Sequence, residues 1–281
     1  MNDNSETVQL LPLTSDIVFK QVFGQEESKP ILRVFLNDVL GLDIQSAEQI
    51  TLLNPIIDPK YIDDKMCILD IRVQLANRSL IDIEIQVLNR HNMEQRALYY
   101  TCQLCTEQLH TGDDYSKTAP VYGLNLLCFD LYEDSRYYRS FILKDEETNK
   151  TYRQNFKIAF FELRKAVNEL SKTKEVETLN LSGLTEQKEV YEKLIEESKT
   201  FEEAYERLKK ASSDETLMAM YRNREKAIRD WNDSINSARK DGEQRVNALY
   251  EKLLQENRGS EIPKAIADPT FRAKLFNEYG I

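Results

Sequence analysis

Hydrophobic and polar residues alternate along two neighbouring segments of the chain, CILDIRVQL (67–75) and LIDIEIQVL (80–88). Successive side chains of a strand point to opposite faces, so a period of two predicts strands with one apolar and one polar face. The four residues between the segments, 76–79, are few enough for a hairpin, and Asn77 tolerates the positive φ of a tight turn. The pattern therefore predicts two adjacent antiparallel strands.

Acidic and amide side chains gather on the polar face of this predicted hairpin. Two pairing registers keep the polar side chains of both strands on the same face. One register sets Asp70 opposite Glu84 and Arg72 opposite Asp82, whereas the other sets Asp70 opposite Gln86 and Arg72 opposite Glu84. Directly opposed Cβ atoms lie roughly 5 Å apart, so both registers bring Asp70, Glu84 and Gln86 together. Facing carboxylates without other partners repel each other, and a divalent cation between them would find the oxygen ligands it prefers. A half-exposed hairpin with ordinary cross-strand pairs shows the same alternation, so the pattern leaves both interpretations open.

Patterns elsewhere in the first 165 residues predict an α/β arrangement, a mixed β-sheet with helices packed on it. The run 121–132 is apolar too continuously for an exposed strand and is typical of a central one. The other predicted elements are helices over 16–23, 30–40 and 92–110, and strands over 50–53, 139–143 and 157–163.

Four cysteines lie inside these apolar or periodic segments. The predicted helix over 92–110 places Leu98, Cys102, Cys105 and Leu109 on one stripe, the expected packing face. Cys102 and Cys105 form a C-x-x-C without a second pair, and the chain has only two histidines, too few ligands for structural zinc. We therefore expect buried free thiols and a reducing cytoplasm.

Composition changes in the second half of the chain: no proline occurs between Pro120 and Pro263, and Glu, Lys and Leu dominate from about Leu184 onward. This predicts two parts, a core over 1–165 and a mostly helical C-terminal region over 166–281 that supplies no metal ligand. Apolar residues at helical spacing in this region are typical of a packing face or a surface for a partner or a second copy. Helices are predicted over 186–196, 200–211, 214–240 and 243–257.

Charge argues against tight, autonomous binding of DNA. The chain of 281 residues has a formal net charge of −10. Residues 1–160 contain 16 Lys and Arg against 24 Asp and Glu, so the acidic excess lies where the site is predicted. No apolar run approaches the roughly 20 residues of a membrane span, and the first residues lack the basic and apolar regions of a secretory signal.

The run YIDDKMCILDIRVQLANRSLIDIEIQ (61–86) resembles the core of the PD-(D/E)XK nuclease-family transposases, the Rpn group of recombination-promoting nucleases. The similarity extends upstream to LTSDIVFKQVFG and downstream to QRALYYTCQL, TGDDY, PVYGLNLLCFD and the helical tail, which is nearly the whole chain. Asp-x(13)-Glu-x-Gln alone is permissive, but the joint order of these segments is far more specific. The resemblance implies a restriction-endonuclease-like fold and metal-dependent hydrolysis of DNA with Mg²⁺, or with Mn²⁺.

The resemblance also implies roles for particular residues. Asp70 and Glu84 would be the two metal-binding acids, and the carbonyl of Ile85 a further ligand. Gln86 stands where the family name expects lysine; a glutamine can orient water but adds no charge for the phosphate. A Gln86→Lys exchange is therefore expected to preserve or raise activity.

Residues on the two flanking helices are candidates for a supporting role. Asp16 resembles an acid that related folds place near the metal, and Lys20, one turn later, would face the phosphate; an exposed i,i+4 ion pair is the alternative. On the helix after the motif, Gln95 and Tyr99 resemble a Gln-x-x-x-Tyr pattern of some relatives, although helix packing also explains Tyr99. The nearest cations for phosphate contact are Arg90 and Arg96, and a purely structural role is equally compatible with their positions.

Two other classes of function compete with the nuclease hypothesis. The chain would keep the nuclease fold but act as an interaction or assembly module through its helical C-terminal region, with little or no catalysis. The acidic core and Gln86 favour this alternative. A helical scaffold with an incidental α/β head is the third interpretation, and binding of a divalent ion at Asp70 and Glu84 separates the first from the other two.

Overall fold

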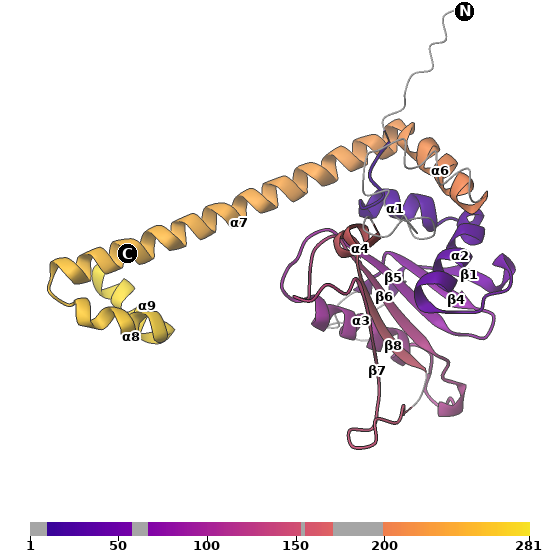
Figure 1. The fold of residues 1–281 in the computed structure, drawn as a ribbon, viewed down its shortest axis with the longest axis horizontal. Helices are drawn as coiled ribbons and strands as arrows, with labels where there is room; N and C mark the ends of the chain where they lie inside the picture. Colours follow the sequence, from indigo (N-terminus) through magenta and orange to yellow (C-terminus); the bar gives the residue numbers. More distant parts are fainter. Residues whose placement is uncertain (1–9, 58–66, 153–154, 171–198) are drawn as a thin grey trace, which may run out of the picture. The chain divides into compact units, whose positions relative to one another are not determined.

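The computed structural model divides into two compact units after Tyr221 (Figure 1). It describes residues 10–57, 67–152, 155–170 and 199–281. Composition predicted a boundary at residue 165 instead. The two boundaries differ because α6 (Lys199–Ser212) packs on the first helices of the chain and buries Leu208 and Ala211 in the core of the first unit.

A mixed six-stranded sheet forms the centre of the first unit, in the order β1-β4-β5-β6-β8-β7. The pairs β5–β6 and β6–β8 are parallel and the others are antiparallel. The predicted central strand is confirmed, because β6 lies between β5 and β8 and is buried along most of its length. The strands are β1 (Ile50–Leu53), β4 (Ile71–Leu75), β5 (Leu80–Gln86), β6 (Val121–Leu127), β7 (Tyr138–Ile142) and β8 (Phe156–Glu162).

The segment 67–75, predicted as one strand, is interrupted before Ile71. Its first residues form β3 (Cys67–Ile68), which pairs with β2 (Ile56–Ile57) in a separate two-stranded sheet. The ladder of the main sheet resumes with β4 after Asp70, whose backbone N–H donates to a side chain instead of to a strand carbonyl. The predicted antiparallel pairing of the two segments is confirmed for β4 and β5.

Helices cover both faces of the sheet, and the period of two decides which residues meet them. The odd-numbered apolar residues of β4 and β5, such as Val73 and Ile83, pack with α1 (Asp16–Phe23), α2 (Lys29–Leu40) and α6 in one core. The opposite face packs on α3 (Met93–Thr106), through clusters that include Leu80. The strand β8 leads directly into α4 (Leu163–Leu170).

The packing face predicted for α3 is wrong. Leu98 is 50% exposed and Cys102 is exposed, while the buried stripe lies one position earlier and consists of Met93, Ala97, Thr101 and Leu104. The cause lies on β6, where a Cβ on Gly123 would collide with the hydroxyl of Thr101. The bare glycine lets Thr101 approach the strand closely and so sets the rotation of the helix.

The cysteines consequently differ from the expectation. Cys102 is an exposed free thiol, and Cys105 and Cys128 are free and half-buried rather than fully buried. Burial raises the pKa of the Cys128 thiol to about 11, so it stays protonated near neutral pH.

Beyond Glu162, every regular element among the described residues is helical, as the composition predicted. Instead of the two helices predicted over 214–240 and 243–257, one continuous helix, α7 (Glu215–Gln255), spans both segments. Gly242 remains helical because one interior glycine costs only about 1 kcal/mol, less than breaking a long helix. The predicted helix over 186–196 lies outside the described residues.

The second unit contains the rest of α7 with α8 (Ile262–Ala267) and α9 (Pro269–Tyr279). Each of the two short helices has a proline in its first turn, where the missing N–H costs nothing. Leu249, Leu253 and Leu275 are among the buried residues that form the small core of this unit. None of the helices in the described ranges is long and apolar enough to cross a membrane.

Candidate active site

The first predicted register is the one observed. Arg72 pairs with Asp82 and Ile71 with Ile83, which sets Asp70, the residue immediately before β4, beside Glu84 near the end of β5. The carboxyl end of β5 therefore meets the start of β4 at one edge of the sheet. In open α/β sheets, this edge is where ligands bind.

The Asp70 and Glu84 carboxylates each accept a hydrogen bond from the backbone of the other's segment. The backbone N–H of Asp70 donates to Oε1 of Glu84 at 3.0 Å, and the N–H of Ile85 donates to Oδ2 of Asp70 at 2.9 Å. Each carboxylate is therefore held by the backbone of the opposite strand, and such charge-assisted hydrogen bonds fix its direction. These hydrogen bonds keep the two acids adjacent.

Gln86 and Arg96 extend this network toward α3. The amide nitrogen of Gln86 donates to Oε2 of Glu84 at 2.8 Å, and its oxygen accepts from Nη1 of Arg96 at 3.1 Å. The guanidinium of Arg96 also lies 4.0 Å from Oε2 of Glu84 and sits over the ring of Tyr100 at 5.4 Å. A positive charge thus reaches the amide that stands at the motif's lysine position.

Lys20 approaches the site from the helix on the other face of the sheet. Its Nζ lies 2.8 Å from Oδ1 of Asp70. Asp70 therefore has a cationic partner in the protein itself, because α1 delivers an ammonium group that no local pattern connects to Asp70. Asp16 begins the same helix one turn earlier and accepts the N–H of Ile17 at 3.0 Å.

Burial and mutual repulsion shape the protonation of the acids. Glu84 is 2% exposed, and burial, followed by the nearby Asp70 carboxylate, raises its pKa to about 8. Burial also raises the pKa of Asp82 well above its ordinary value, and the charges of Glu84 and Asp70 add to the effect. Ionising these acids therefore costs free energy in the metal-free protein, and a bound cation would offset that cost.

Two residues of the site were not assigned to it from the sequence. Asp82 is buried, and its Oδ1 has no hydrogen-bond partner among the described residues. The sequence signal that could have identified Asp82 is its even-numbered position, which places it on the same strand face as Glu84. Tyr100 lies one helical turn after Arg96, and its ring contacts the Arg96 guanidinium. The i,i+4 spacing of the two residues could have predicted this contact.

The remaining predicted contacts lie outside this hydrogen-bonded cluster. Gln95 and Tyr99 lie on the exposed side of α3, where Tyr99 is 37% exposed. Arg90 is exposed in the loop between β5 and α3. All three side chains are exposed to solvent.

The donor set suits a hard divalent cation. Asp70 and Glu84 provide carboxylate oxygens from adjoining strands, and magnesium prefers oxygen ligands. Within the described residues, no group of three or more His, Cys, Asp or Glu side chains is arranged to hold a metal. A cation here would therefore depend on two carboxylates together with carbonyl and water oxygens.

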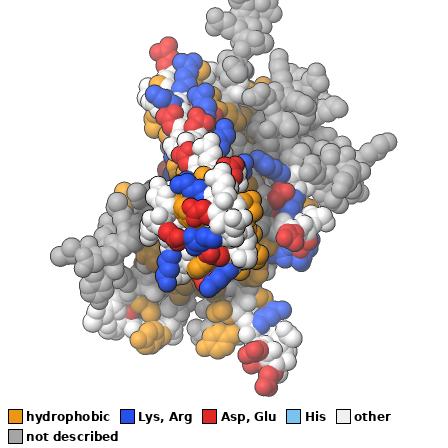
Figure 2. All heavy atoms as spheres, turned by 90° about the vertical axis from the view of Figure 1, so that its left-hand side faces the viewer, with side chains coloured by type: hydrophobic (Ala, Val, Ile, Leu, Met, Phe, Trp, Pro, Cys, Tyr) orange, Lys and Arg blue, Asp and Glu red, His pale blue; other side chains and the backbone are white. Residues whose placement is uncertain are grey.

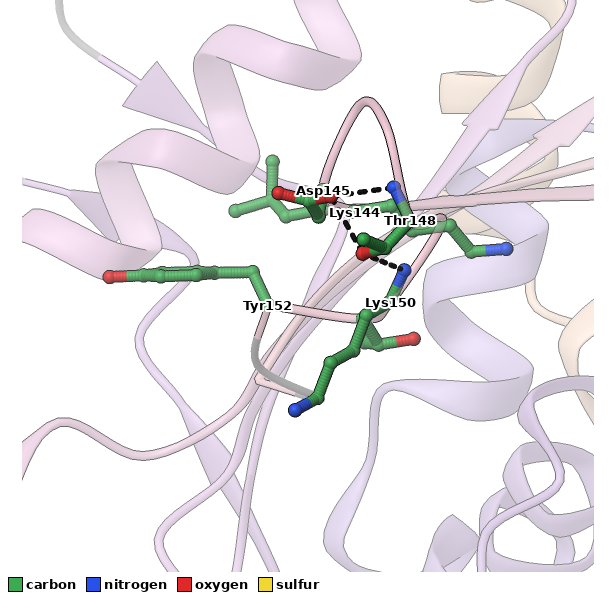
Figure 3. Close-up of a pocket in the computed structure, with 7 residues that line it drawn as sticks. Lys144, Asp145, Thr148, Lys150 and Tyr152 are labelled. Atoms are coloured by element: carbon green, nitrogen blue, oxygen red, sulfur yellow. Dashed lines mark hydrogen bonds between the residues drawn. The ribbon is translucent and has the colours of Figure 1, made fainter.

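A shallow hollow on the turn between β7 and β8 belongs to the turn itself (Figure 3). Its described lining runs from Leu143 to Tyr152. Asp145 accepts the N–H and the hydroxyl of Thr148 at 2.7 and 2.6 Å, which closes the turn, and the ring of Tyr152 extends away from them. Local hydrogen bonding explains this hollow, and we assign it no part in the chemistry.

A mixed sheet flanked by helices, with Asp70 and Glu84 joined at its edge and Gln86 two positions on, defines the PD-(D/E)XK nuclease fold. A family model described as PD-(D/E)XK nuclease family transposase matches residues 13–238, and the chain belongs to this family. The comparison with curated proteins found no match, and neither did the comparison with solved structures.

Proposed function

We propose that this protein is a metal-dependent DNA endonuclease of the recombination-promoting type, with Asp70, Glu84 and Gln86 at its reaction centre. The observation that carries the proposal is the mutual bracing of Asp70 and Glu84 by the backbone of the opposite strand. Burial, followed by the adjacent Asp70 carboxylate, raises the pKa of Glu84 to about 8, so ionising Glu84 costs stability in the free protein. Such cost is typical of functional sites.

Asp70 and Glu84 would hold Mg²⁺, or Mn²⁺, with the carbonyl of Ile85 as a further ligand. When bound, such a cation polarises a phosphoryl oxygen and lowers the pKa of a bound water. Gln86 would position the attacking water through its amide, whose direction is set by Glu84 and Arg96.

Arg96 provides the charge that Gln86 lacks. Its guanidinium is half-buried and carries a fixed positive charge beside the amide, where a lysine would carry its own. We infer that Arg96 stabilises the phosphate, and that Lys20 contributes a second positive charge from α1. Exposed Arg90, Gln95 and Tyr99 would contact the DNA strand around the site.

A plasmid-cleavage assay with Mg²⁺ and with Mn²⁺ tests the proposal. Wild type should cut only with metal, and Glu84→Gln should not cut. Glu146→Gln makes the same chemical exchange in the exposed β7–β8 turn and should cut like wild type. Equal cleavage by wild type and Glu84→Gln would rule out this reaction centre.

Self-association through the helical C-terminal region is a second function, favoured by one feature of α7. Ile228, Trp231 and Ile235 follow each other at spacings of three and four, the pattern of a coiled-coil seam, and Ile235 is 50% exposed. Lys and Arg side chains interleave with Asp and Glu side chains over the helices that face the viewer in Figure 2. This mixed surface suits a protein partner better than a DNA backbone.

Sedimentation or light scattering across a concentration series would test the seam. A second copy of the chain is the proposed partner, and Ile235→Lys should abolish any concentration-dependent dimer. Ser234→Lys, one position away and off the seam, serves as the matched control. A monomer at all concentrations would exclude self-association.

The free thiols of Cys102, Cys105 and Cys128 support a reducing, cytoplasmic setting for both functions.

A further inference from the structure

We propose that Lys20 is the internal counter-ion of the site, holding Asp70 in the metal-free protein and competing with a divalent cation for that carboxylate. The inference rests on the proposed metal site at Asp70 and Glu84. It assigns Lys20 a positioning role that acts before any substrate arrives.

Geometry supports the assignment because Lys20 completes the contacts of Asp70. Oδ2 of Asp70 accepts the N–H of Ile85 at 2.9 Å, and Oδ1 lies 2.8 Å from Nζ of Lys20. The Asp70 side chain is only 12% exposed, whereas that of Lys20 is 40% exposed. A partly exposed ammonium is therefore paired with a nearly buried carboxylate.

The other cations near the site are less suited to this task. Arg72 forms an ion pair with Glu107 and donates to the carbonyl of Asn54 at 3.3 Å. Arg96 lies at 4.0 Å from Glu84 and is joined to Gln86. Among the described residues, Lys20 is the one with a direct ion pair to Asp70.

The helix can keep its place while the ammonium moves. Val18, Phe19 and Val22 anchor α1 in the core of the first unit, so the backbone at Lys20 is held. A lysine carries its charge on a flexible four-carbon stem and can exchange partners without moving the backbone. A cation that takes Asp70 must displace this ammonium, and its affinity is lowered by the strength of the ion pair.

Titration of the full-length chain with Mg²⁺ or Mn²⁺ alone, followed by calorimetry, tests the competition without any DNA. Lys20→Met should bind metal roughly tenfold more tightly than wild type, since one competing charge is removed from a partly solvated site. Lys29→Met is the matched control: Lys29 pairs with Glu26 and has no contact with Asp70 in the structure, so its affinity should stay at the wild-type value. Lys20→Arg keeps the charge and should stay near wild type.

Thermal unfolding supplies a second readout and guards against a folding defect. Lys20→Met should have a lower midpoint than wild type in EDTA but a larger gain on adding metal. If Lys20→Met binds metal no more tightly than Lys29→Met, the counter-ion role is refuted while the metal site stands. If Asp70→Asn binds metal as well as wild type does, both the proposed metal site and the role of Lys20 are refuted.

Discussion

Arg96 donates to the side-chain oxygen of Gln86 at 3.1 Å, so the amide nitrogen of Gln86 must face Glu84. A glutamine has one donor end and one acceptor end, and a cation on one side fixes its orientation. The pair thereby combines what a single lysine offers at this position: a donor to the carboxylate and a nearby positive charge. Gln86 replaces the family's lysine, and Arg96 on α3, the next element along the chain, supplies the positive charge.

This pairing predicts the result of a double-variant cycle. Arg96→Gln should lower the cleavage rate roughly tenfold to a hundredfold, because a charge that stabilises the phosphate is lost. Gln86→Lys should preserve or raise the rate, since its ammonium can donate to Glu84 as the amide does. In the Gln86→Lys background, Arg96→Gln should cost much less. Single-turnover rates of the four proteins measure the coupling, and strictly additive effects would refute the shared role.

The raised pKa of Glu84 predicts how stability depends on pH in the absence of metal. The folded protein holds this proton up to about pH 8, whereas the ordinary pKa is 4.5. Stability from this group is therefore fully present below about pH 4.5 and is lost as the pH rises through 8, by on the order of a few kcal/mol. Urea unfolding in EDTA between pH 5 and 9 should show a shallower loss for Glu84→Gln than for wild type.

Metal should reverse this trend, because a cation binds the deprotonated acid. The gain in unfolding midpoint on adding Mg²⁺ should grow between pH 6 and 9 in wild type and be absent in Glu84→Gln. Asp82 also has a raised pKa, so the stability of Glu84→Gln in EDTA should still depend on pH to some extent. A gain independent of pH would contradict the assignment of Glu84 as a ligand.

The contact between Gly123 and Thr101 predicts a large effect of a small substitution. A methyl group at Gly123 would collide with the Thr101 hydroxyl, which itself donates to the carbonyl of Ala97 at 2.7 Å. Gly123→Ala should lower the free energy of unfolding by about 1–3 kcal/mol, as overpacking does in other cores. Thr101→Ala should recover part of this loss in the double variant. Urea denaturation measures both, and an unchanged stability of Gly123→Ala would disprove the close approach.

Periodicity was enough to predict which residues of β4 and β5 share a face, because successive side chains of a strand always point to opposite faces of the sheet. It could not choose between the two registers, since that choice depends on Asp70 accepting the N–H of Ile85, a contact across fifteen positions. The stripe of α3 was misplaced by one position for a similar reason: the rotation of the helix depends on a glycine in another strand. Lys20 and Asp70 meet through tertiary packing that no local pattern encodes.

The two acids should differ in what their removal does to the metal-free fold. Glu84→Gln keeps an acceptor for the N–H of Asp70 while removing a buried charge, so the unfolding midpoint in EDTA at pH 8 should rise. Asp70→Ala leaves the N–H of Ile85 and the ammonium of Lys20 without their acceptor, which should cost about 1–3 kcal/mol. Both variants should lose metal-dependent cleavage of plasmid DNA. Equal midpoints for the two variants would show that the bracing of Asp70 contributes nothing to the fold. Cleavage that survives in either one would remove that residue from the reaction centre.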